Sequence, residues 1–126
     1  MNKNTISSIE IRLLREGQKA NKDDVIRIRP AEDFEEGSGR FYITHQDRHS
    51  EKKWEFYENW DGVGAYLAQI FTVLPYDADP YYRIHFSLPA YPSIMVRIED
   101  LNEPYLMSRV WDMLDTTARG WPKTVQ

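Results

Sequence analysis

The clearest alternation of apolar and polar positions lies just after the middle of the chain, between residues 61 and 74. Apolar side chains recur there every three or four residues, as they do on the buried side of an amphipathic helix. Asp61 is placed to accept hydrogen bonds from the first amides, and Pro75 prevents a further turn. We expect Gly62 to relax the entry turn and Gly64 to let the helix approach a neighbouring layer closely. The apolar positions of this predicted helix are Val63, Tyr66, Leu67, Ile70, Phe71 and Leu74.

Six other segments alternate apolar and polar residues with a period of two, which is the pattern of strands that bury one face. They group into three hairpins, two before the helix and one after it, and the last hairpin closes around the loop Pro89–Pro92. The first segment also has a helix as its rival, because Ser7 and Glu10 have the spacing of a capping box. Its apolar residues spread around a helical wheel, which favours a strand. The predicted strands are Ile9–Leu14, Val25–Arg29, Arg40–His45, Lys53–Glu58, Tyr81–Leu88 and Ser93–Glu99.

A second helical stripe closes the chain, formed by Leu106, Met107, Val110, Trp111 and Leu114. Asp100 or Asn102 could cap this helix, and Pro104 is acceptable in a first turn. Gly120, followed by Pro122, predicts its end. The element order is therefore ββββαββα. It predicts an α+β fold, a two-layer sandwich of about six mostly antiparallel strands with two helices packed on one face, in a single domain over residues 1–126.

Composition narrows the classes of protein that remain. The chain has 126 residues, and this length is enough to form a buried core without disulfides or a structural metal. Charged residues make up 29% of it, which is close to the average of soluble folded proteins. It contains no long apolar run and starts with polar residues, so we expect a soluble, cytoplasmic protein with no membrane span. The absence of cysteine excludes disulfides, thiolate catalysis and cysteine-ligated metals from this sequence.

The predicted sheet leaves one face uncovered. Six strands span roughly 25 to 30 Å, whereas two helices cover roughly 20 Å. We expect Ile26, Ile28, Phe41, Ile43, Trp54, Phe56, Tyr82, Ile84, Phe86, Ile94, Val96 and Ile98 to face the helices. The pleat then sends to the other side Arg12, Arg27, Arg29, Arg40, Tyr42, Thr44, Glu55, Tyr57, Tyr81, Arg83, His85, Met95, Arg97 and Glu99.

Arginine and tyrosine dominate this second set. Such a face suits a protein interface or the stacking and phosphate contacts of single-stranded nucleic acid, although arginine stems also cover any solvated sheet. The net charge of −4 disfavours phosphate unless the arginines are sharply segregated, and Glu55, Glu99 and the predicted acidic loop at residues 32–36 work against that.

We therefore interpret the chain as a non-catalytic protein-interaction or assembly module. It would be a small accessory or regulatory protein, of the kind that phages, viruses or bacteria use, that binds another protein or itself as a homodimer. The alternative is single-stranded nucleic-acid binding on the arginine- and tyrosine-rich face. The expected partner-binding residues are Arg27, Arg29, Tyr42, Tyr57, Arg83, His85, Tyr91 and Arg97.

The aromatic content supports an interface, since tyrosine and tryptophan bury large areas at low entropic cost. The predicted loops or their flanks hold Tyr76, Tyr81, Tyr91, Tyr105 and Trp121. Tyr91, between two prolines, is the leading contact candidate, and its alternative is a ring folded back over its own hairpin.

Catalytic and metal-binding patterns are weak by comparison. His45, Asp47 and His49 alternate, so an extended segment could aim all three at a metal, with His85 as a fourth ligand. We interpret these histidines as ordinary surface and edge residues. We interpret Asp77 and Asp79 as part of a turn between two prolines. No serine has the context of a nucleophile. We expect neither enzymatic activity nor a cofactor nor a metal.

Overall fold

The computed structural model describes residues 8–15, 23–31, 41–47, 51–76, 82–89 and 91–124, with side chains up to residue 120. The elements follow the order ββββαββα and the predicted α+β class is confirmed. The strands are β1 Ile9–Leu14, β2 Asp24–Pro30, β3 Phe41–Asp47, β4 Lys52–Glu58, β5 Arg83–Leu88 and β6 Tyr91–Arg97. The helices are α1 Trp60–Val73 and α2 Pro104–Thr124, with short 3-10 helices η3 Leu74–Tyr76 and η4 Ile98–Asn102.

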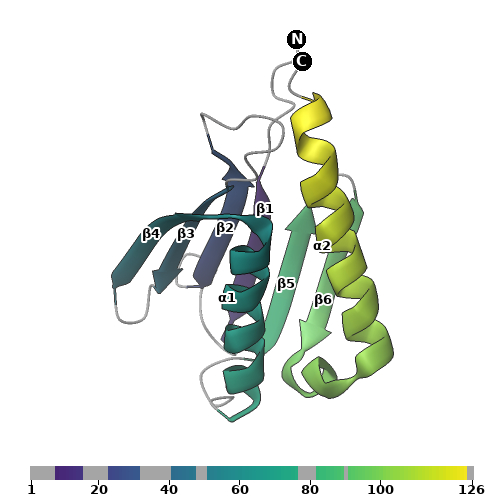
Figure 1. Cartoon of the computed structure of the whole chain (residues 1–126). Helices are drawn as coiled ribbons and strands as arrows, with labels where there is room; N and C mark the ends of the chain where they lie inside the picture. Colours follow the sequence, from purple (N-terminus) through teal and green to yellow (C-terminus); the bar gives the residue numbers. More distant parts are fainter. Residues whose placement is uncertain are drawn as a thin grey trace.

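The six strands form one sheet in the order β4-β3-β2-β1-β5-β6, and every neighbouring pair is antiparallel. The three predicted hairpins are therefore present. Both helices lie against the same side of the sheet, α1 in front of its middle and α2 in front of β5 and β6 (Figure 1). The other side, which we call the open face, is covered by neither of the two helices (Figure 1).

The first element is a strand, and the rival helix is wrong. Ile9, Ile11 and Leu13 point into the core with at most 2% of their surface exposed. Because β1 is the central strand, its backbone bonds β2 on one edge and β5 on the other. Burial on one face at every second residue is what the period-two pattern encodes.

The core lies between the sheet and the two helices. Val63, Leu67 and Phe71 of α1 and Val110 and Leu114 of α2 pack there with the apolar side chains of the strands. Each buried aliphatic side chain of this size stabilises the fold by about 1.5 to 3 kcal/mol relative to exposure. This apolar layer holds the helices and orients the sheet, so that alternate strand residues project onto the open face.

The N-cap of α1 lies two residues before the predicted one. Asn59, and not Asp61, is the N-cap, and its side-chain oxygen accepts a hydrogen bond of 2.8 Å from the amide of Gly62. Asp61 lies inside the first turn, where its negative charge interacts favourably with the positive end of the helix dipole. The predicted role of Gly64 is also wrong, because a Cβ atom there would meet no atom within 4 Å. The close approach occurs at Gly62, whose Cβ would lie 2.2 Å from Oε1 of Glu58.

The ends of α2 also differ. Pro104 occupies the first position as predicted, but Asp100 and Asn102 belong to η4 and do not cap α2. The helix continues through Gly120 to Thr124. Glycine costs only about 1 kcal/mol in a helix, so it weakens this turn without ending it.

Several strand ends are shifted as well. β6 begins at Tyr91, so the predicted loop Pro89–Pro92 is too long, and β6 ends at Arg97, which leaves Ile98 and Glu99 in η4. Tyr82 precedes β5 and is 48% exposed, so it does not face the helices. Trp54 is on the helix side, paired with His45, yet it remains 44% exposed because β4 extends beyond α1 (Figure 1). Arg40, Tyr81 and the acidic stretch 32–36 lie outside the described residues.

Among the residues that the structure describes, no helix combines the length and the apolar character needed to cross a bilayer.

Candidate interaction surface

The open face brings together most of the residues that the sequence singled out for binding. Strand register places Arg29, Tyr42 and Tyr57 in one row across β2, β3 and β4. Another row, at the opposite end of the strands, contains Arg83 on β5 directly beside Arg97 on β6. Between them lie Arg27 and His85, while Tyr91 packs against the core on the helix side.

The centre of the open face is close to neutral, because Arg12 and Arg27 share Glu10 and Arg12 also lies 3.9 Å from Asp23. Glu10 accepts hydrogen bonds of 2.9 Å from both Arg12 and Arg27. Burial on its own would raise the pKa of Glu10, but the hydrogen bonds and charges of the two arginines together lower it. Arg12 and Arg27 are therefore held by an internal carboxylate and are poor candidates for a partner's anion.

At one corner of the face Arg29 stacks on Tyr42, which in turn contacts Tyr57. The guanidinium of Arg29 lies 4.6 Å from the ring centroid of Tyr42, and the ring centroids of Tyr42 and Tyr57 are 5.1 Å apart. Glu55 receives hydrogen bonds from Tyr42 and Lys53. Partial burial and the hydrogen bond to Glu55 raise the pKa of Tyr42. The hydrogen bonds from Lys53 and Tyr42 lower the pKa of Glu55.

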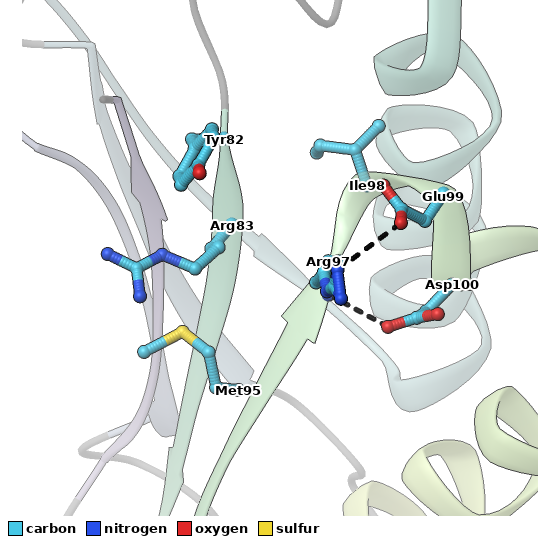
Figure 2. A pocket seen from close by; sticks show the side chains of 7 residues that line it. All are labelled: Tyr82, Arg83, Met95, Arg97, Ile98, Glu99 and Asp100. Carbon is cyan, nitrogen blue, oxygen red and sulfur yellow. Dashed lines mark hydrogen bonds and ion pairs between the residues drawn. The ribbon is translucent and has the colours of Figure 1, made fainter.

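The diagonally opposite corner is a depression of about 640 Å³ at the start of β5 and the end of β6. Figure 2 shows Tyr82 and Met95 on either side of Arg83, with Arg97 directed toward Glu99. The Arg83 guanidinium lies 5.3 Å from the Tyr82 ring centroid, and among the described residues no carboxylate pairs with it. Nη1 of Arg97 lies 3.5 Å from Oε2 of Glu99. This ion pair is exposed to solvent and contributes little to the stability of the fold.

These two corners lie roughly 20 Å apart, because three two-residue steps along the strands and two strand spacings separate Arg29 from Arg83. The chain as a whole is acidic, with a net charge of −4. On the described strands, by contrast, the open face is cationic. Its cations are Arg12, Arg27, Arg29, Lys53, Arg83 and Arg97, and its carboxylates are Glu10 and Glu55.

A second depression, of about 420 Å³, lies on the helix side at the end of α1, next to η3, η4 and the start of α2. Phe71, Met107 and Trp111, which the sequence pattern assigned to the core, contribute to its lining. Tyr76 and Tyr105, two of the predicted loop aromatics, are 88% and 82% exposed. Tyr81 and the side chain of Trp121 lie outside the described residues.

His45 and His85, the two histidines that the structure describes, lie on opposite faces of the sheet. His45 lies on the helix side and hydrogen-bonds the Tyr66 hydroxyl through Nδ1, whereas His85 lies on the open face beside Arg12. Burial lowers the pKa of His45, and the charge of Asp47 partly opposes this. Within the described ranges no three histidine or carboxylate side chains could hold a metal ion. His49, Asp77 and Asp79 lie outside those ranges.

A scan of protein-family models and searches of curated proteins and solved structures found no match to this chain.

Proposed function

We propose that the chain is a non-catalytic interaction module whose open face binds an acidic protein partner. The observation that carries the proposal is a pair of arginines at opposite corners of the open face. Arg29 and Arg83 each stack on a tyrosine, and no carboxylate of the described residues pairs with either.

Stacking prepares both guanidinium groups for a ligand. An arginine held over an aromatic ring loses less freedom on binding, is weakly hydrated, and offers two parallel donors to a carboxylate. The separation of roughly 20 Å equals about six residues of extended chain. A partner that presents carboxylates at that spacing would contact both corners at once, while the neutralised centre would lie under the segment between them.

Charge favours a protein over a nucleic acid. Glu55 lies beside the tyrosine pair of one corner, and Glu99 and Asp100 line the depression at the other. A continuous phosphate chain would be repelled at both places, whereas a protein can offer donors there and carboxylates to the arginines. A second copy of the same face would place arginines against arginines, so we propose a different protein for this surface.

Single-stranded nucleic acid remains the second candidate, favoured by one observation. Cations are segregated on the open face, and two of them, Arg29 and Arg83, are stacked on tyrosines. Arginine beside exposed aromatic rings is the combination that such ligands use for backbone contact and base stacking.

The test uses defined probes. One is an extended peptide with two glutamate pairs six residues apart, another is the same peptide with glutamines, and the third is an oligothymidylate. We expect the glutamate peptide to bind, to weaken as salt rises, and to lose about tenfold or more in affinity with Arg29→Gln/Arg83→Gln, because two charged hydrogen-bonding sites are removed. Arg109→Gln, an exposed arginine on α2, is the matched control and should bind like the original chain.

Binding of the oligothymidylate alone, with the same dependence on Arg29 and Arg83, would replace the protein candidate by the nucleic-acid candidate. Equal affinities of the original chain and the double variant for every probe would show that the open face is ordinary solvated surface.

A further inference from the structure

The two edges of the sheet differ in their capacity to accept another strand. β6 contains Pro92, which has no amide hydrogen to donate, and its pairing with β5 shifts register between Phe86 and Leu88. Prolines and bulges are devices that blunt a sheet edge. β4 contains neither. Its pairing with β3 runs without interruption over the whole strand, and no described element lies beyond its outer edge (Figure 1).

From this difference we infer that β4 is a dimerisation edge, which pairs antiparallel with β4 of a second copy of the chain. The inference concerns the edge of the sheet and does not rest on the function proposed for Arg29 and Arg83. An unblunted edge strand presents a row of free backbone donors and acceptors, and a second identical strand satisfies them about a two-fold axis.

The charges of β4 suit such a pairing. Cations occupy the beginning of the strand, Lys52 and Lys53, and carboxylates its later part, Glu55 and Glu58. An antiparallel copy reverses this order. With Trp54 on the two-fold axis, Lys53 of each copy lies directly opposite Glu55 of the other, so two opposite-charge pairs form on the open face. If the edge charges served only to repel other strands, they would not need this complementary arrangement.

Neighbouring registers are less favourable. With Glu55 on the axis, the two Glu55 carboxylates would lie directly opposite each other, and like charges in that position are destabilising. A shift by a single residue would exchange the two faces of the joined strand. The charges of β4 therefore favour the register centred on Trp54 over the register centred on Glu55.

The other face of β4 supplies apolar area. Trp54 is 44% exposed on the helix side, and Phe56 beside it is half-buried. The two-fold axis brings the Trp54 rings of both copies together, which is a favourable cross-strand pair. One strand per copy makes a small interface, so we expect a dissociation constant of about 10 to 100 µM. Pairing would join the two sheets and place their open faces side by side.

The first experiment measures mass by light scattering and sedimentation over a range of concentrations. The original chain should dimerise with the affinity given above. Lys53→Glu and Glu55→Lys should each weaken the dimer by about tenfold or more, because each places like charges opposite one another at two symmetric sites. Lys52→Glu, with the same charge change at a position opposite Phe56 of the other copy, is the control and should dimerise like the original chain.

Mixing the two weakened variants gives a result that misfolding cannot imitate. In the mixed pair, two carboxylates of the Lys53→Glu copy face two lysines of the Glu55→Lys copy, so a heterodimer should form. The double variant Lys53→Glu/Glu55→Lys should self-associate again for the same reason. An original chain that stays monomeric up to about 1 mM, or a mixture without heterodimer, overturns the proposal.

The register can be tested with single introduced cysteines, because the chain contains no cysteine of its own. Trp54→Cys places two thiols opposite each other on the axis, within reach of a disulfide. Glu55→Cys places its thiols two positions apart on the joined strands. Under mild oxidation the first variant should cross-link faster, and equal or reversed rates would contradict the register centred on Trp54.

Discussion

Gly64 lies in the second turn of α1, and replacing it with alanine should stabilise the protein. A Cβ atom at this position meets no other atom within 4 Å, so the methyl group adds no clash. Glycine in a helix interior is less favourable than alanine by roughly 0.5 to 1 kcal/mol, mainly because the unfolded glycine is more flexible.

The expected gain can be expressed as a temperature. Unfolding entropy is about 2.1 cal/mol/K per residue, so for 126 residues a gain of 0.5 to 1 kcal/mol raises the melting temperature by about 2 to 4 °C. Urea unfolding should show the same free-energy gain with an unchanged slope, since the surface exposed on unfolding stays the same.

Gly62→Ala provides the contrast in the same helix. Its Cβ would lie 2.2 Å from Glu58 Oε1 and 3.1 Å from Glu58 Cβ, so the Glu58 side chain must move. This displacement offsets the propensity gain, and we expect little or no stabilisation. Calorimetry on both variants decides the matter. A melting temperature for Gly64→Ala at or below that of the original chain would refute an open position at residue 64.

Two further predictions concern polar contacts of α1. Trp60→Phe removes the 2.6 Å hydrogen bond from Nε1 of Trp60 to Asp115 of α2. Urea unfolding should show that the free energy of unfolding falls by about 1 to 3 kcal/mol. A decrease below about 0.5 kcal/mol would contradict a stabilising hydrogen bond. Burial lowers the pKa of His45 below its usual 6.5, so the unfolded chain binds the proton first. Stability should therefore fall as the pH drops below about 7.5, and His45→Gln should remove this slope; persistence of the slope would assign it to other groups.

The sequence was sufficient to predict the element order and the face that each strand buries. Ile26 and Ile28 alternate with Arg27 and Arg29, and this pattern alone separates the core from the open face. The period of burial is local information, since it depends on which side of the pleat a residue occupies. Helix ends were predicted less well, because Asn59 and Asp61 both offer capping oxygens and only backbone geometry decides between them.

The pairing of side chains could not be predicted, because it depends on strand order. The sequence does not show that Glu10 lies between Arg12 and Arg27, or that Arg83 lies beside Arg97. It also gave no sign of the buried ion pair of 3.2 Å between Arg15 and Asp24, two residues that lie between the first two predicted strands. Strand register brings Glu10 between Arg12 and Arg27, and it leaves Arg29 and Arg83 at two corners where no carboxylate of the described residues pairs with them.

The position of β1 has a consequence for the order of folding. The first strand of the chain occupies the middle of the sheet, and one of its edges is completed by β5, where Ile11 pairs with Phe86. Strands β1 to β4 can assemble from contacts between sequence neighbours, but β5 must close a long loop across α1 to reach β1. During synthesis the free edge of β1 therefore stays available to incorrect strands until most of the chain has left the ribosome.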